Sequence, residues 1–269
     1  MISARIWRQT LGILRKNPVT LLPFFIIGLF DTISLVFIYL APRPPLSIVL
    51  APPIRTFFGE RYLHYPFNLL LIPQLFRYTH IMVTATIGVL MTGLAIGLIN
   101  QAKETDKPGI LSNLICALKR YLTLLLIWLI IFVLAFLVYK IPSIFLSIKN
   151  TTIAYTIFYL SFLVTIIIQA IFVYVFPAVL IEQRGLISAI KRGLSFSRKH
   201  FLTTLMLVVI PALFYLPIII LRAKTTVLMS RFFPEIVLVI LGAGIIITLL
   251  IDCLVTYSTT ILFLNQRRA

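Results

Sequence analysis

Three times in this chain, a short segment that mixes apolar and basic residues ends in two adjacent cations and leads directly into a long apolar segment. The cation pairs are Arg15-Lys16, Lys119-Arg120 and Arg198-Lys199. An apolar stretch of about 20 residues is long enough to cross a bilayer as a helix. The pattern therefore predicts one unit repeated three times, a helix on the membrane surface followed by two membrane-spanning helices.

The composition places the chain in a membrane rather than in water. Of its 269 residues, 61% are hydrophobic and 12% are charged, whereas soluble domains carry about a quarter charged residues. We predict an all-α polytopic protein whose residues 1–269 form a single transmembrane domain with six spans, at about 20–40, 81–99, 121–139, 153–176, 201–221 and 236–263. The long outer loop at 41–78 is rich in proline yet contains apolar runs, which predicts a segment that lies on the membrane or re-enters it.

The positions of the basic residues set the expected orientation. Lys and Arg near the ends of spans are retained on the cytoplasmic side, and with six spans most of the 24 cations fall on the side of the N-terminus. We therefore expect both termini in the cytoplasm. Arg77 and Arg222 are then assigned to the outer side, beyond the ends of their spans.

The three basic segments are predicted to be amphipathic helices. On a helical wheel, residues 186–200 place apolar and small side chains on one half and the cations on the other. Residues 110–120 separate in the same way, and the N-terminal segment does so more loosely. With a net charge of +17, we expect anionic phospholipids as partners and no nucleic acid. Two interpretations remain open, a topological anchor or a regulatory lipid-binding site, and the predicted headgroup ligands are Arg15, Lys16, Lys119, Arg120, Lys191, Arg192, Arg198 and Lys199.

Asp31 and Asp252 are the two carboxylates that fall inside predicted spans. An ionised carboxylate at the bilayer centre costs about 2.5 to 3.5 kcal/mol, so each must face protein or water, pair with another group, or hold a proton. We expect no Lys or Arg at matching depth in another span. The functional interpretation is a proton or cation relay, or a polar point in a substrate cavity. The structural interpretation is a bond that ties two helices together, with nearby hydroxyls as partners: Thr32, Ser34, Thr256 and Ser258.

Small residues and prolines mark two of the predicted spans. Gly88, Gly93 and Gly97 lie along the second, and the GxxxG spacing of the last two predicts close packing of another helix. Pro211 and Pro217 predict a kink in the fifth span. Kinked helices line binding sites in some transporters.

The outer segment from Phe58 to Pro66 concentrates charged and aromatic residues. Arg61 and His64, with two neighbouring tyrosines, could hold a lipid phosphate, because Arg is a planar bidentate donor. The alternative is that Glu60 pairs with Arg61 and that the tyrosines form an ordinary interfacial belt.

The sequence contains none of the short motifs that mark common catalytic sites, such as GxSxG, HExxH or a phosphate-binding loop. Its histidines, His64, His80 and His200, are scattered, and its two cysteines do not join them in a cluster with metal-ligand spacing. We therefore predict no catalytic residue, no metal and no cofactor.

The run Phe176–Leu186, then Ala189–Leu194 and Ser197-Arg198, resembles the middle signature of a broad family of six-span prokaryotic membrane proteins. That family includes the membrane domain fused to some glycerophosphoryl diester phosphodiesterases and related stand-alone inner-membrane proteins. The opening from Trp7 to Pro23 is similar to the start of the same family. The resemblance implies the fold and a prokaryotic cytoplasmic membrane. No phosphodiesterase domain follows in this chain, so the resemblance does not carry that activity over.

These observations lead to two functional hypotheses of different classes. The first is a non-enzymatic membrane protein that binds lipid, or that serves as a scaffold or subunit for a membrane protein partner or a second copy of itself. The alternative is a small transporter or permease that uses Asp31 and Asp252 near the midplane. A third hypothesis, a lipid-modifying enzyme acting at Glu60–Tyr65, has no matching catalytic motif.

Overall fold

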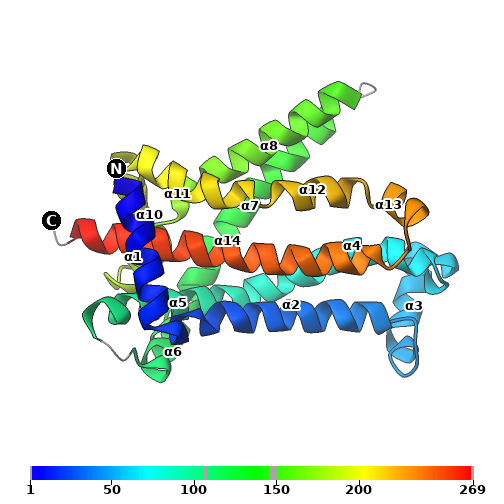
Figure 1. The fold of residues 1–269 in the computed structure, drawn as a ribbon, viewed down its shortest axis with the longest axis horizontal. Coiled ribbons are helices and arrows are strands. Elements are labelled where there is room, and N and C mark those ends of the chain that lie inside the picture. Colours follow the sequence, from blue (N-terminus) through cyan, green and yellow to red (C-terminus); the bar gives the residue numbers. More distant parts are fainter. Residues whose placement is uncertain (1, 106–107, 146–150, 268–269) are drawn as a thin grey trace. The chain divides into compact units, whose positions relative to one another are not determined.

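The computed structural model describes residues 2–105, 108–145 and 151–267, and every regular element in these ranges is helical (Figure 1). The predicted all-α class is therefore confirmed. Five helical stretches in the described ranges are long and apolar enough to cross a membrane: Pro18–Leu40, Phe67–Glu104, Tyr121–Lys140, Tyr159–Leu180 and Ile236–Arg267. A sixth would come from Leu186–Lys199 and Phe201–Leu213 if this pair, bent by 92°, were one span.

The chain divides into two compact units, each built from separate segments, where the sequence predicts a single domain. The first unit comprises Met1–Pro23, Val89–Leu213 and Asp252–Ala269, and the second comprises Phe24–Gly88 and Phe214–Ile251. The long C-terminal helix α14 (Ile236–Arg267) contributes residues to both.

The second unit contains most of α2 (Leu22–Leu40), the beginning of α14, and the helices between residues 47 and 88 and between 216 and 231. Those helices are α3 (Ser47–Phe58), η2 (Glu60–Leu63), α4 (Phe67–Val83), the π-helical η3 (Thr84–Gly88), α12 (Leu216–Ala223) and α13 (Thr225–Arg231). Apolar side chains from α2, α4 and α14 pack into one core, and these are Leu35, Leu69, Ile72, Phe76, Val237, Leu241 and Ile245.

The segment predicted as an outer loop, 41–78, is largely helical. Helix α4 already begins at Phe67, so the second long apolar stretch starts fourteen residues before the expected position 81. Its first turns are helical because Leu69, Leu71 and Ile72 bury an apolar face. Pro73 lies inside the helix without ending it.

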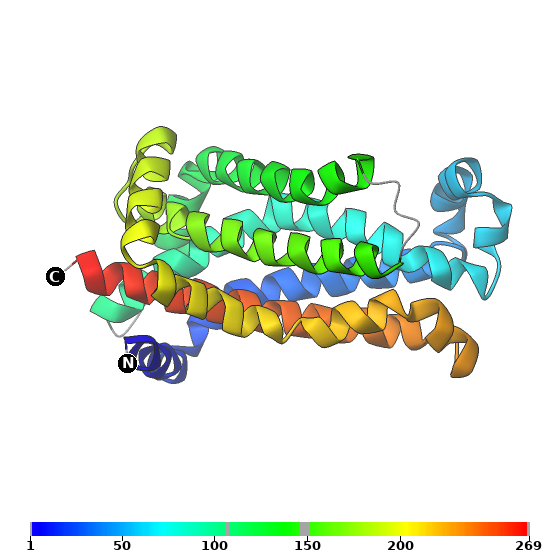
Figure 2. The same cartoon turned by 90° about the horizontal axis from the view of Figure 1, so that it is seen from above.

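The first unit contains α1 (Ile2–Lys16), the 3₁₀ turn η1 (Pro18–Leu21) and the remaining helices. These are α5 (Val89–Glu104), α6 (Ile110–Lys119), α7 (Tyr121–Phe145), α8 (Thr151–Phe172), α9 (Val175–Leu180), α10 (Leu186–Lys199) and α11 (Phe201–Leu213). Helices α7 and α8 run side by side (Figures 1 and 2). The predicted kink between Pro211 and Pro217 takes the form of a break, because α11 ends at Leu213 and α12 begins at Leu216.

The three basic segments do form helices, α1, α6 and α10. Their apolar faces differ in how far they are buried. In α10, Gly193 and Phe196 are buried against protein: the Phe196 ring lies 4.6 Å from that of Tyr174 and 5.0 Å from that of Phe263. In α6, by contrast, Leu111 and Leu118 are exposed. Part of the α10 face that the wheel assigned to lipid therefore packs on the rest of the first unit.

Candidate functional site

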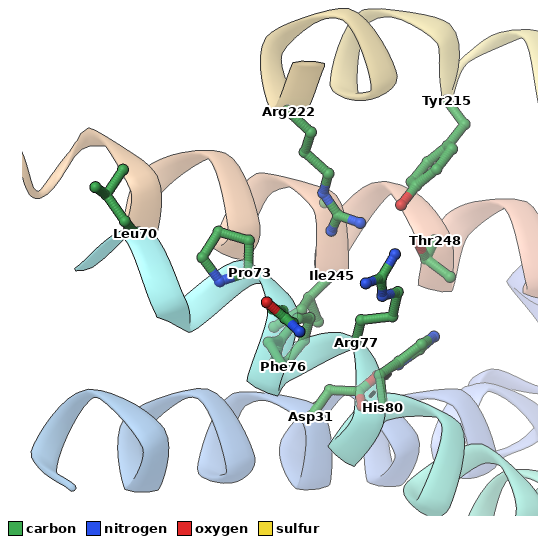
Figure 3. Close-up of a pocket in the computed structure, with 12 residues that line it drawn as sticks. Asp31, Leu70, Pro73, Phe76, Arg77, His80, Tyr215, Arg222, Ile245 and Thr248 are labelled. Atoms are coloured by element: carbon green, nitrogen blue, oxygen red, sulfur yellow. Dashed lines mark hydrogen bonds and ion pairs between the residues drawn. The ribbon is translucent and has the colours of Figure 1, made fainter. Parts of the chain in front are cut away.

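A pocket of about 400 Å³ opens within the second unit, between α2, α4, α12 and α14 (Figure 3). This volume lies within the range of small-molecule sites. Its apolar lining includes Leu70, Pro73, Phe76 and Ile245. Its polar lining consists of Asp31, Gln74, Arg77, His80, Tyr215, Arg222 and Thr248.

Asp31 is the buried acid of this pocket. Asp31 is only 2% exposed, and its Oδ1 lies 3.0 Å from Nδ1 of His80 on α4. The His80 ring also stacks on Phe76, one turn earlier in the same helix, with ring centroids 5.9 Å apart. A buried carboxylate without a partner is costly, so the His80 contact explains how α2 can carry an acid in an apolar segment.

Thr32, expected as a local partner of Asp31, instead donates a hydrogen bond to the carbonyl of Gly28 at 2.7 Å. Its hydroxyl is thus satisfied within α2. Asp252 lies on α14 in the other unit, is half-buried, and is not among the residues that line the pocket. The two aspartates therefore do not form a common site inside this pocket.

Arg222, near the end of α12, reaches into the pocket across the backbone of α14. A Cβ on Gly244 would lie 2.6 Å from Nη2 of Arg222, so the absence of a side chain there makes room for the guanidinium. The guanidinium carbon lies 5.7 Å from the ring centroid of Tyr215, within cation–π range. Its Nε is buried and has no hydrogen-bond partner among the described residues.

Arg77 brings a second guanidinium to the same space. It lies on α4 one turn before His80, and it points toward Arg222 and Tyr215 (Figure 3). Among the described residues, neither arginine forms an ion pair, while the one carboxylate of the pocket contacts His80. The pocket therefore holds two unneutralised cations beside hydroxyl and amide groups, an arrangement that suits an anionic ligand.

This cluster corrects the expectation that no cation accompanies Asp31. The sequence places Arg77 and Arg222 on the outer side, because it predicts that the second span begins at 81 and that the fifth ends at 221. A signal was nevertheless present: Gln74, Arg77 and His80 follow one another at intervals of three, a spacing that places polar side chains along one side of a helix.

Some of the predicted headgroup ligands are exposed, and others contact acceptor groups of the protein. Arg15, Lys16, Lys119, Lys191, Arg198 and Lys199 are exposed. Arg192 instead lies 3.3 Å from the carboxylate of Glu182, and Arg120 donates to the carbonyl of Gln183 at 3.3 Å. Arg198 also borders a groove of about 300 Å³ that Ile171, Leu194 and Phe201 line.

In the segment from Phe58 to Pro66, the pair of Glu60 with Arg61 does not form. Glu60 contacts Arg55 at 3.1 Å, and Arg61 donates to the hydroxyl of Tyr62 at 3.0 Å while lying over its ring. His64 is exposed. Reduced hydration and the nearby carboxylate of Glu235 raise the pKa of Tyr65 above its ordinary value.

The glycines singled out for helix packing behave differently from one another. A Cβ on Gly93 would meet Leu124 and Ala117 at 3.0 and 3.2 Å, and one on Gly97 would meet Asn113 at 2.6 Å. Both therefore allow close approach of α6, and Gly93 also of α7. At Gly88 the three nearest atoms belong to Thr84 and Val83, in its own helical stretch.

Comparison with known proteins identifies the family. A family model described as a domain of unknown function, DUF7847, matches residues 1–264, so the chain belongs to that family. A search of curated proteins finds no match, and a search of solved structures finds none either. Within the described ranges, no group of three or more His, Cys, Asp or Glu side chains could hold a metal ion.

Proposed function

We propose that this protein crosses a prokaryotic cytoplasmic membrane six times, with both termini in the cytoplasm, and binds an anionic phospholipid without converting it. The observation that carries the proposal is the pocket of the second unit, where Arg77 and Arg222 face one space and neither has a carboxylate partner among the described residues. A lipid phosphodiester is the anion that a membrane supplies at highest concentration.

The chemistry of the lining fits a lipid headgroup. An arginine can donate two parallel hydrogen bonds to a phosphate, and it stays charged at any pH that a protein encounters. The buried Nε of Arg222 lacks a partner in the described structure, which leaves a donor for a ligand oxygen. The hydroxyls of Tyr215 and Thr248 line the same space and could bind the glycerol or headgroup oxygens.

The apolar side of the lining fits an acyl chain. Leu70 and Pro73 border the pocket on α4 and Ile245 borders it on α14. Large apolar side chains are also exposed on the outer faces of these helices, among them Met82 and Ile246. Such surfaces are stable in lipid and unfavourable in water, so a phospholipid could enter from the bilayer with its phosphate between the arginines.

The basic helices support the proposed orientation. In α6, Leu111, Ile115 and Leu118 are exposed next to Lys119, as expected of a helix that lies in the headgroup region. Each basic side chain near an anionic surface contributes about 1 kcal/mol. We propose that α1, α6 and α10 hold the cytoplasmic face against the membrane in this way.

The test is the amount of phospholipid that the protein retains. We would reconstitute the wild type and Arg222→Gln in nanodiscs containing phosphatidylglycerol, then release the protein gently into a mass spectrometer. A charged hydrogen-bonded contact contributes about 1.5 to 3 kcal/mol, so the variant should bind the lipid about tenfold or more weakly. Arg77→Gln should weaken binding in the same direction.

Arg231→Gln is the matched control, because Arg231 is exposed on α13 of the same unit and does not line the pocket. It removes the same charge and should leave retention unchanged. Equal retention of phosphatidylglycerol by Arg222→Gln and Arg231→Gln would contradict the proposal.

The contact between Asp31 and His80 favours a second candidate function, proton-coupled transport, because it places two titratable groups at the wall of a cavity. In liposomes that contain a pH-sensitive dye, Asp31→Asn and His80→Gln would then abolish proton flux while leaving the protein folded. Unchanged flux in both variants would remove this candidate.

A further inference from the structure

A second cationic pocket lies in the first unit, where α9 ends and α10 begins. It has a volume of about 560 Å³, and its lining includes Glu182, Arg184, Arg192 and Arg267. The four come from the α9–α10 connection, from α10 and from the last turn of α14. None of them lies in the unit that contains Asp31 and Arg222.

Glu182 orients two of the arginines. Its side chain is 8% exposed, its Oε2 lies 2.5 Å from Nε of Arg184, and its Oε1 lies 3.3 Å from Nη2 of Arg192. Nε of Arg192 also donates to the same Oε1 at 3.3 Å. The carboxylate is thus shared between two guanidinium groups whose own side chains are 43% and 38% exposed.

These contacts leave donors available. A guanidinium has five N–H groups, and Arg184 uses only its Nε on Glu182 in the described structure. Arg267 has no carboxylate partner among the described residues and is exposed. Three arginines and one glutamate give the pocket a net charge of +2, which is opposite to that of a phosphate group that has lost two protons.

The backbone fixes this arrangement. Helix α9 ends in a turn in which Gln183 adopts a left-handed conformation with φ of 52°, and the Arg184 N–H donates to the carbonyl of Ala178 at 3.4 Å. Arg120 lies between α6 and α7. Its side chain donates a hydrogen bond to the carbonyl of Gln183 at 3.3 Å and so links this turn to the α6–α7 connection. A held turn limits the motion of the side chains on it, and preorganised donors lose less entropy on binding an anion.

We propose that this pocket binds a phosphate group, with Arg184 and Arg267 as direct donors and Glu182 as the residue that positions Arg184 and Arg192. The phosphate belongs either to a free phosphate-bearing solute or to a lipid headgroup, and both offer the same oxygens to the arginines. The site goes beyond the lipid pocket of the second unit and shares no residue with it.

The experiment measures binding of two probes to the full chain in nanodiscs of zwitterionic lipid. Inorganic phosphate is titrated in one arm, followed by calorimetry, and phosphatidic acid is included in the nanodisc in the other, followed by mass spectrometry. Arg267→Gln should weaken binding about tenfold in the arm that contains the true source. Both arms are run in the Arg222→Gln background, so that binding in the second unit is weakened.

Arg231→Gln is the control, since Arg231 is exposed on α13, does not line the pocket and is not among the predicted headgroup ligands. A loss confined to the phosphate arm identifies a free solute, and a loss confined to phosphatidic acid identifies a headgroup. Arg184→Gln provides a second variant, and thermal unfolding shows whether each variant is folded. The proposal is overturned if the starting protein binds neither probe, if Arg267→Gln and Arg184→Gln bind as it does, or if Arg231→Gln weakens binding equally.

Discussion

Gly244 lies directly under the guanidinium of Arg222, so closely that a Cβ at this position would come within 2.6 Å of Nη2. We expect Gly244→Ala to push Arg222 out of the pocket, because the end of a flexible side chain moves more easily than the backbone of α14. Retention of phosphatidylglycerol in nanodiscs should fall several-fold.

Gly242→Ala is the internal control for this prediction. It lies two residues away in the same helix, and a Cβ there would meet none of the described residues within 4 Å, so it adds the same methyl group without a clash. Replacing a helical Gly by Ala stabilises a helix by up to about 1 kcal/mol, and lipid retention should stay at the wild-type level. If Gly242→Ala lost more phosphatidylglycerol than Gly244→Ala, this result would contradict the assignment of Arg222 to the pocket.

The contact between Asp31 and His80 should appear as an energetic coupling. We expect Asp31→Asn and His80→Gln to be non-additive, with a coupling of about 0.5 to 3 kcal/mol in the free energy of unfolding. Thermal or denaturant unfolding in detergent measures it. Thr32→Val combined with His80→Gln should be additive, because the Thr32 hydroxyl bonds within its own helix. Additivity in both pairs would show that the contact does not contribute to stability.

Much of the fold was predictable from the sequence because long apolar stretches are a strong signal. The predicted spans at 20–40, 121–139 and 236–263 each lie within or nearly match a described helix or helical stretch. The short basic helices were predictable as helices from their periodicity. The burial of these helices was not predictable. A helical wheel shows that Phe196 lies on an apolar face, but it does not show whether lipid or the ring of Tyr174 covers that face.

The pocket was missed for a different reason. Asp31 was predicted to be an acid inside a span, but its partner depends on where α4 begins, and helix ends are the least certain part of such a prediction. Once α4 starts at Phe67, Arg77 and His80 become helical neighbours on a side that faces α2 and α14. Arg222 could be assigned only with the break between α11 and α12, because the sequence predicts one continuous span at 201–221 there.

Close packing of α10 on α9 should make Gly193 sensitive to substitution. A Cβ there would lie 2.9 Å from the backbone nitrogen of Val175 and 3.1 Å from its Cα, and backbone cannot move aside as a side chain can. Gly193→Ala should lower the free energy of unfolding by about 1 to 3 kcal/mol. Gly12→Ala in α1, where nothing lies within 4 Å, should leave it unchanged or raise it slightly. Comparable unfolding temperatures for the two variants would argue against this packing.

His200, between α10 and α11, should make stability depend on pH. Burial and the positive charge of Lys199 lower the pKa of His200 below its ordinary value of 6.5. The unfolded chain therefore binds a proton at a higher pH than the folded protein does. The contribution is fully present above about pH 6.5 and is lost as the pH falls through that value toward the lower pKa of the folded state.

Unfolding temperatures measured from pH 7.5 downward test this prediction. His200→Gln should remove the decrease that begins near pH 6.5, because glutamine does not titrate. Lys199→Gln should make the decrease smaller, since it removes the charge that helps to keep the imidazole neutral. If the His200→Gln profile had the same slope as the wild type, the acid sensitivity would have to come from another group, and the packing of His200 against Phe196, with ring centroids 4.9 Å apart, would carry no pH dependence.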